Sequence, residues 1–340
     1  MKQTYSFDDV LLAPRFSDVE SRKEVNLTSK LDDNIILSLP IISSPMDTIT
    51  EASMAVPMSQ LGGLGVIHRY NSIDHQAELV KEVHSSGAKN IAAAIGMNEE
   101  AIDRAVHLVL AGANIICVDV AHGHHIMMED TIKILKAHFA NDVHIMAGNV
   151  ATLEAFDALA SWGADSIRVG IGGGSICSTR LVTGHGVPTF QSILDCSKST
   201  YDVKIIADGG VKTTGDMVKA FAAGADFVMV GSMLAGTTET PGEIFVGKEG
   251  KKYKVYRGMA SVNAQNSWRS RSSTPEGIST TVPFKGGIGP VLENIAGGIR
   301  SGLSYSGARS LAELRSKASF ILQTSSGQVE SSTHVLWRNK

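Results

Sequence analysis

Eight short apolar runs recur along the chain, and most of them are followed by a segment with helical spacing. The runs are LPIISSPM (39–46), GGLGVIHRY (62–70), NIAAAIG (90–96), IICVDVAHG (115–123), HIMAGNV (144–150), SIRVGIG (166–172), KIIADGG (204–210) and FVMVGSM (227–233). Runs rich in Ile and Val are typical of strands buried on both faces. Their alternation with helices indicates parallel βαβ units, and eight such units close into a (β/α)8 TIM barrel. A doubly wound open sheet is the alternative, and the even spacing favours the barrel.

The segments between and after these runs complete the predicted fold. Helical segments end on Gly112, Gly163 and Gly224, which suit a helix C-cap before the next strand. After the eighth run, 243–258 predicts a β-hairpin around Gly250. Residues 259–275 show no periodicity, so we expect a short mobile flap over about 259–277. Segments 289–307 and 310–323 predict closing helices, and we expect residues 1–340 to form a single domain.

Composition excludes several classes of function. A net charge of −3 over 340 residues gives no electrostatic footprint for nucleic acid or a membrane surface. Three cysteines, at 117, 177 and 196, make no disulfide framework. No apolar segment reads as a signal peptide or reaches the roughly 20 residues of a membrane span. We therefore expect a cytoplasmic protein.

Polar residues and glycines gather where the predicted strands end, which is where barrel enzymes carry their functional groups. The loop GIGGGSICSTR (170–180), the ADGG turn at 207–210 and the GS pair at 231–232 predict a phosphate site. Asp208 and Asp119 end strands and suit ribose hydroxyls. Ordinary tight turns and helix capping are the structural alternatives.

Cys177 differs from the other two cysteines because it lies in a polar loop at a strand end. Nearby Arg180 and backbone N–H groups would favour its thiolate, so we expect a nucleophile there. A buried thiol beside a tight turn is the alternative, and it is the interpretation we adopt for Cys117 and Cys196, which lie within apolar segments.

Together these segments resemble the IMP dehydrogenase/GMP reductase family over nearly the whole chain. The matching motifs, in the family's order, are FDDVLLAP, SSPMDTITE, GGLGVIH, DVAHGH, AGNV, GSICSTR, ADGG, GSMLAGT, PGE, YRGM and PEGI. The resemblance implies a barrel enzyme, commonly tetrameric, that acts on a purine mononucleotide (GMP, IMP or XMP) with NADPH or NAD.

The resemblance also implies roles for individual residues. Cys177 would attack C2 of the purine, and Thr179 and Glu276 would handle protons. The substrate-binding residues it implies are Ser44 and Met46 at the nucleotide pocket, Met259 at the base, Asp208 at the ribose, and Ser175, Gly210, Gly231, Ser232 and Tyr256 at the 5′-phosphate. Asp119, with Asn149 close by, would meet the nicotinamide ribose. A potassium site would use Gly172, Gly174 and Cys177 of one subunit and Glu330 of the next.

The flap distinguishes the two reactions of the family. Family dehydrogenases use an adjacent Arg-Tyr pair on it to activate water, whereas SVNAQNSWRSRSSTPEG (261–277) offers Arg269 and Arg271 with no tyrosine after either. The CBS pair that dehydrogenases usually carry is absent, and Gly173 stands where the family normally has proline. The motifs DVAHGH, SPMDTITE and VESSTHV resemble dehydrogenases instead.

We favour GMP reductase (GMP and NADPH to IMP and ammonia) because the flap carries the step that separates the two reactions. IMP dehydrogenase (IMP, NAD and water to XMP and NADH) is the alternative. A nucleotide-binding homologue without turnover is a third interpretation, from a different class.

Overall fold

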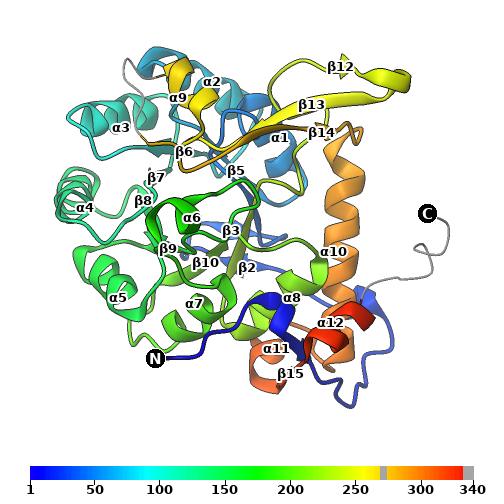
Figure 1. Ribbon diagram of the computed structural model, residues 1–340. Coiled ribbons are helices and arrows are strands. Elements are labelled where there is room, and N and C mark those ends of the chain that lie inside the picture. Colours follow the sequence, from blue (N-terminus) through cyan, green and yellow to red (C-terminus); the bar gives the residue numbers. More distant parts are fainter. Residues whose placement is uncertain (269–273, 332–340) are drawn as a thin grey trace.

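The computed structural model describes residues 1–268 and 274–331, and its centre is a closed barrel of eight parallel strands (Figure 1). Their order around the barrel is β10-β11-β4-β5-β6-β7-β8-β9, so each strand lies beside its sequence neighbour and β11 closes onto β4. The strands are β4 (Ile41–Ser43), β5 (Leu64–Ile67), β6 (Ala92–Ile95), β7 (Ile115–Asp119), β8 (His144–Val150), β9 (Ser166–Val169), β10 (Lys204–Asp208) and β11 (Phe227–Val230). Each lies within one of the eight apolar runs, and the (β/α)8 prediction is confirmed.

Helices surround the barrel and bury its outer face (Figure 1). The helices that follow the barrel strands are α1 (Ala52–Gln60), α2 (Ile73–Ser85), α3 (Ala101–Leu110), α4 (Ile126–Phe139), α5 (Leu153–Trp162), α6 (Thr179–Thr183), α7 (Thr189–Cys196), α8 (Thr214–Ala223) and α10 (Ile288–Tyr305). Gly163 ends α5 at a φ of 110°, where an L side chain would be strained. α2 alone links β5 to β6, with no inserted domain between them.

A small hairpin closes the N-terminal end of the barrel. It pairs β2 (Ser29–Lys30) with β3 (Ile36–Leu37), and its Leu31, Ile35 and Leu37 belong to the same buried cluster as the side chains inside the barrel. These apolar contacts close the barrel interior at the N-terminal ends of the strands. Loops on the opposite, C-terminal face are therefore the ones free to form a site.

A polar triad of a partly exposed aspartate and two buried side chains joins this hairpin to the barrel. The Asp32 carboxylate accepts a hydrogen bond from His144 Nδ1 at 2.6 Å, and His144 Nε2 lies 2.9 Å from Ser166 Oγ. This hydrogen bond lowers the pKa of Asp32 to about 2, although partial burial opposes the shift. Ser166 is fully buried, so the triad holds the hairpin and has no access to a substrate.

Beyond β11 the chain forms a three-stranded antiparallel sheet from β12 (Phe245–Val246), β13 (Lys252–Arg257) and β14 (Ser279–Pro283). β12 and β13 are the predicted hairpin, and the sheet projects beside the barrel (Figure 1). Lys254 is buried and donates to the carbonyl oxygens of Thr237, Thr238 and Thr240, which ties the sheet to the loop after β11.

Two expectations for the C-terminal third need correction. The stretch expected to be irregular contains a helix, α9 (Val262–Trp268), begun by Ser261, whose Oγ accepts from the N–H of Ala264. The second closing helix, α11 (Leu311–Lys317), is shorter than predicted, because its C-cap Ala318 is extended. Phe320–Leu322 is instead a strand, β15, paired with β1 (Val10–Leu12). Local apolar spacing did not distinguish this strand from a helix.

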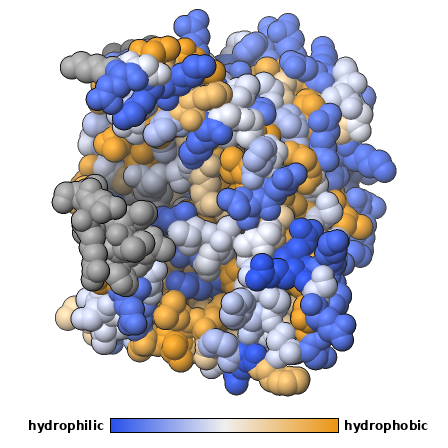
Figure 2. Space-filling model, turned by 90° about the vertical axis from the view of Figure 1, so that its right-hand side faces the viewer, coloured by the Kyte–Doolittle hydropathy of each residue, from blue (hydrophilic) through white to orange (hydrophobic). Residues whose placement is uncertain are grey.

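The face that carries α10 mixes hydrophilic and hydrophobic side chains (Figure 2). Exposed apolar residues near it include Phe245 and Val246 on β12 and Ile321 and Leu322 on β15. The short helix α12 (Ser325–Glu330) follows β15. Within the described parts of the chain, no helix has the length and apolar character needed to cross a bilayer.

Candidate active site

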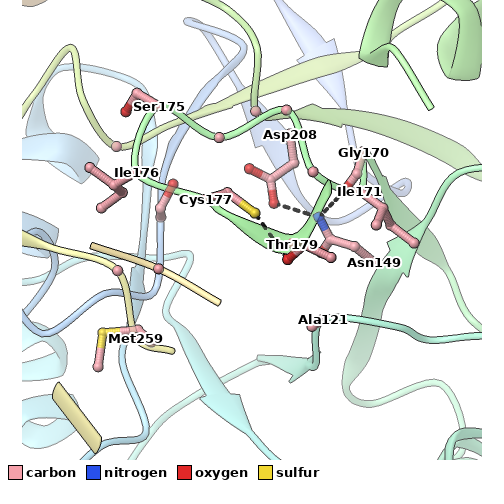
Figure 3. Close-up of a pocket in the computed structure, with 18 of the residues that line it drawn as sticks. Ala121, Asn149, Gly170, Ile171, Ser175, Ile176, Cys177, Thr179, Asp208 and Met259 are labelled. Carbon is pink, nitrogen blue, oxygen red and sulfur yellow. Dashed lines mark hydrogen bonds between the residues drawn. The ribbon is translucent and has the colours of Figure 1, made fainter. Parts of the chain in front are cut away.

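A cavity of about 680 Å³ opens at the C-terminal ends of the barrel strands. Pockets that hold drug-sized ligands are typically 300–1,000 Å³, so this one has room for a nucleotide. Residues at or beyond the C-terminal ends of β4, β5, β7, β8, β9, β10 and β11 line it, and Figure 3 shows part of this lining. The predicted site residues that line it are Ser44, Met46, Asp119, Asn149, Gly172, Gly174, Ser175, Cys177, Thr179, Asp208, Gly210, Gly231, Ser232, Tyr256, Met259 and Glu276.

Cys177 lies in the loop between β9 and α6, with its sulfur directed toward Thr179 (Figure 3). Its Sγ donates to Thr179 Oγ1 at 3.1 Å. It is the exposed cysteine of the three, and Cys117 and Cys196 are buried as predicted. Burial raises the pKa of both other thiols to about 12, so neither is a competing nucleophile.

Glu276 reaches Cys177 from a distant part of the chain by strand-like pairing. The N–H of Ser178 donates to the Glu276 carbonyl at 2.9 Å, and the N–H of Ile278 donates to the Ile176 carbonyl at 3.0 Å. The N–H of Glu276 donates in turn to Ala260. The pairing fixes the end of the flap against the cysteine loop, so the three residues expected to be catalytic share one wall of the cavity.

The structure shows where Arg180, the cation expected near Cys177, makes its contacts. Arg180 donates through Nη2 to the Val187 carbonyl at 2.8 Å, and its side chain packs over Gly172 and Gly186. It therefore braces the loop that carries Cys177.

The glycines of the predicted phosphate site permit close backbone approach. Gly209 has a φ of 84°, and a Cβ there would lie 3.0 Å from the Gly174 nitrogen. A Cβ on Gly231 would lie 3.2 Å from Met46 Sδ and 3.4 Å from both Ser44 Oγ and the Tyr256 hydroxyl. The lack of side chains at these two positions therefore lets the loops pack closely around the cavity.

Hydroxyl groups complete this corner. The Ser175 and Tyr256 hydroxyls are 3.3 Å apart. Burial raises the pKa of Tyr256, although the hydrogen bond with Ser175 acts in the opposite direction. Both hydroxyls are thus protonated at neutral pH and able to donate to an anion.

Arg168 is the site residue that sequence reasoning missed. It lies on β9, is 6% exposed, and joins the two predicted ribose carboxylates. Nη1 lies 2.5 Å from Asp119 Oδ1, and Nε and Nη2 lie 3.2 and 2.8 Å from Asp208 Oδ2. Asn149 Nδ2 also donates to Asp208, at 2.9 Å (Figure 3). A cation within the apolar run SIRVGIG was the available signal, because a buried arginine requires partners.

Electrostatics keep this cluster charged. Burial alone would raise the pKa of Asp119, but the charges of Arg168 and Arg69 outweigh it and lower the pKa. Burial disfavours the charge of Arg168 as well, yet Asp208 and Asp119 raise its pKa well above the usual value. The cavity therefore contains fixed charges on one wall.

An aromatic cluster borders the same wall and was also missed. The Tyr70 and Trp268 rings have centres 4.8 Å apart, and the Arg69 guanidinium lies 4.8 Å from the Tyr70 ring centre. Tyr70 donates to Asp119 at 3.4 Å. Trp268 belongs to α9, so the first part of the predicted flap reaches the cavity.

Met259 is held at the other side of the cavity. The Asp47 N–H donates to Met259 Sδ at 3.4 Å, and the Asp47 carboxylate accepts from Arg257 Nε at 3.0 Å. Arg257 also donates to Asn263 and Ser267 of α9. One arginine thus connects the loop after β4 to the flap helix.

Two residues singled out from the sequence, Arg269 and Arg271, lie outside the described residues. Glu330 is exposed on α12 and does not line this cavity; the resemblance assigns it to the site of a neighbouring subunit. Within the described residues, no cluster of three or more His, Cys, Asp or Glu side chains could hold a metal ion.

A nicotinamide cofactor fits these residues in two respects. Asn149 Oδ1 is buried and has no hydrogen-bond partner among the described residues, so it can accept from an amide or hydroxyl. The Tyr70 and Trp268 rings offer flat apolar surface beside the Asp119 carboxylate.

The family model described as "IMP dehydrogenase / GMP reductase domain" matches residues 4–334. The chain belongs to this family. Family enzymes are oxidoreductases of purine nucleotides that use nicotinamide cofactors, and this matches a cavity that combines an exposed cysteine with a glycine-lined corner.

Similar proteins carry the names of both reactions. The inosine-5′-monophosphate dehydrogenase of Cryptosporidium parvum is 39% identical, over 97% of this chain and 94% of that protein. The GMP reductase of Leishmania major is 34% identical, over 97% and 96%. A crystal structure of GMP reductase from Trypanosoma brucei, in complex with guanosine 5′-monophosphate, superposes with a TM-score of 0.93 at 32% identity and covers 98% of both chains.

Proposed function

We propose that the chain is a GMP reductase, which converts GMP and NADPH to IMP, ammonia and NADP. The observation that carries this proposal is the set of residues beside Cys177 and on the flap. Thr179 and Glu276 border it, whereas the segment from 259 to 277 contains no tyrosine to pair with an arginine in activating water. Hydrolysis needs a positioned base, and ammonia release needs a proton donor.

The chemistry follows from these residues. The Cys177 thiolate forms a bond to C2 of guanine, and the C2–N2 bond breaks as ammonia leaves with a proton delivered through Thr179 and Glu276. The purine remains attached to sulfur as a thioimidate. NADPH, when bound beside Asp119 and Asn149, would supply a hydride to C2; the C2–S bond would then break with its electron pair returning to Cys177, which regenerates the thiolate and gives IMP.

The remaining residues would bind and orient. Ser175, Gly210, Gly231, Ser232 and Tyr256 hold the 5′-phosphate by N–H and O–H donors. Asp208 binds the ribose, and Ser44, Met46 and Met259 enclose the base. Asp119 and Asn149 bind the nicotinamide riboside.

Assembly and ion binding are further parts of the proposal. The carbonyls of Gly172, Gly174 and Cys177 would bind potassium together with Glu330 of a neighbouring subunit, which requires an oligomer, and we propose a homotetramer. Exposed apolar side chains such as Phe245 and Leu322 support association.

IMP dehydrogenase is the second candidate. The motif DVAHGH, which ends β7, and the 39% identity to a dehydrogenase favour it. The two reactions share the thioimidate and differ in the step that follows.

Nicotinamide absorbance separates the candidates. Purified protein is incubated with GMP and NADPH, and separately with IMP, NAD and potassium. Loss of NADPH with formation of IMP and ammonia is expected. NADH and XMP formation instead would overturn the proposal in favour of the dehydrogenase. No turnover in either mixture, with nucleotide still bound, would indicate a binding protein without catalysis.

A further inference from the structure

A buried side chain on α7 packs against the loop that carries Cys177. Thr189, the first residue of α7, is 3% exposed. Its Oγ1 is buried and has no hydrogen-bond partner among the described residues. An unpaired buried hydroxyl is unfavourable, so hydrogen bonding does not explain this position.

Steric packing does explain it, because Gly173 lies against the same hydroxyl. A Cβ on Gly173 would lie 2.5 Å from Thr189 Oγ1, closer than real Cβ contacts allow. Backbone atoms confine the other side, with the Gly210 nitrogen at 3.3 Å and the Gly209 carbonyl carbon at 3.4 Å. The Thr189 hydroxyl thus occupies the space that a side chain at residue 173 would need.

The same threonine makes a second approach to this loop. A Cβ on Gly170 would lie 3.4 Å from Thr189 Cγ2 and would collide with the Asp208 carbonyl. The loop therefore meets Thr189 at both Gly170 and Gly173. One residue later, the Gly174 carbonyl accepts from the N–H of Cys177 at 3.1 Å, so a shift at Gly173 passes directly to the cysteine.

We propose that Thr189 is a positioning residue for Cys177. Its hydroxyl and methyl groups interlock with Gly173 and Gly170 and fix the backbone from which the thiol projects. The interlock acts by shape, because interiors packed at crystal density transmit small displacements. It deepens the proposed function, in which Cys177 is the nucleophile, but its test needs no nucleotide.

Alkylation of Cys177 by iodoacetamide measures the position and ionisation of the thiol in the intact protein. Cys177 is the exposed cysteine, so the reagent is selective. We expect Gly173→Ala to lower the rate at pH 8 about tenfold, in line with the usual effect of overpacking, and to shift the pH profile. Thr189→Ala removes both groups of the interlock and should also slow alkylation, by about threefold, because the loop loses the contacts that fix it.

A double variant tests whether the effect of Gly173→Ala arises from its contact with Thr189. Gly173→Ala with Thr189→Ala removes the 2.5 Å contact and places the new methyl group at position 173 in the space that Oγ1 occupied, so the packing, the parent rate and the pH profile should be restored. Gly173→Ala with Thr189→Val should stay slow, because a methyl group takes the place of Oγ1. Gly289→Ala is the matched control, since a Cβ there meets nothing within 4 Å.

Three results would overturn the proposal: a parent-like rate in Gly173→Ala, a parent-like rate in Thr189→Ala, or no recovery in the double variant with Thr189→Ala. If Gly173→Ala does not fold, Thr189→Leu replaces it as the test, because the larger side chain on α7 would contact the same glycine. It must then slow alkylation while circular dichroism remains unchanged, and a parent-like rate overturns the proposal equally.

The proposed function can fail separately. If the alkylation results hold but neither nucleotide is turned over, Thr189 positions a thiol whose reaction is not the one proposed. If turnover occurs and the alkylation rates do not respond, the function stands and the interlock is wrong.

Discussion

Arg168 Nη2 on β9 lies 2.8 Å from Asp208 Oδ2 on the neighbouring strand β10. The same guanidinium also reaches Asp119 on β7. The two carboxylates proposed for the two riboses are therefore held at a fixed separation by one buried cation. This coupling suggests that changes in either nucleotide subsite affect the other.

Replacing the cation tests this coupling. Arg168→Met leaves two buried carboxylates without their partner and should lower the free energy of unfolding by about 3 kcal/mol. Arg168→Lys keeps the charge but cannot contact both carboxylates through a planar fork, so we expect an intermediate effect. Urea unfolding measures the stability, and KM for each substrate measures the coupling. A parent-like Arg168→Met would contradict this account.

The proposed nucleophile is tested by Cys177→Ser. We expect turnover to fall by at least about 1,000-fold, because a hydroxyl is a far weaker nucleophile at neutral pH. Nucleotide affinity, measured by calorimetry, should remain within about threefold. Cys196→Ser is the control for removing a thiol elsewhere. Full turnover in Cys177→Ala would disprove covalent catalysis.

Glu276→Gln tests proton transfer. The amide keeps the shape of the carboxyl group but does not exchange a proton, so kcat should fall about 100-fold or more with little change in KM. Glu243→Gln, on an exposed stretch before β12, is the matched control. Equal kcat values for the Glu276 variant and the parent would remove this residue from the mechanism.

Tyr256→Phe tests the phosphate corner. Loss of the hydroxyl near Ser175 should raise KM for the nucleotide about tenfold, since hydrogen bonds to charged groups are among the stronger ones. KM for the nucleoside, which lacks phosphate, should not change. Tyr253→Phe in the same strand provides the comparison. A similar rise for nucleotide and nucleoside would place Tyr256 away from the phosphate.

Asp32→Asn tests the triad at the closed end. The pKa of Asp32 is about 2 in the folded protein, against the usual 3.8, so the carboxylate stabilises the fold above about pH 4 and loses that effect as the pH falls toward 2. The variant should be about 1 kcal/mol less stable at pH 7, less than the full shift implies because water reaches the carboxylate. Denaturation at several pH values should show the difference shrinking in acid. A constant difference would contradict the linkage.

Much of the barrel was predictable because its signals are local. Each apolar run became a strand, and Gly112, Gly163 and Gly224 follow their helices at positive φ. The strand β15 was not predictable from the same kind of pattern, because an apolar stretch of three residues fits a helix or a strand. Only its pairing with β1, some 300 residues away, selects the strand.

The site residues also fall into those that the sequence predicts and those that it does not. Cys177 and Asp208 stand out because polar residues at strand ends are a property of the sequence. Arg168 and Thr189 act through partners that only the closed barrel brings near; the apolar run around Arg168 signals that it needs partners, but it does not identify them. Buried cations and small residues at helix starts are therefore where inspection of a structure adds most.

Because the hairpin of β2 and β3 closes one end of the barrel, the two ends differ in what they contain. Apolar side chains fill the closed end, while the cavity lies among loops at the open end. Substitutions in the flap can therefore accumulate without destabilising the barrel. Changes in a few loop residues could therefore convert one reaction of the family into the other. This arrangement is consistent with relatives of similar identity, some named GMP reductase and others IMP dehydrogenase.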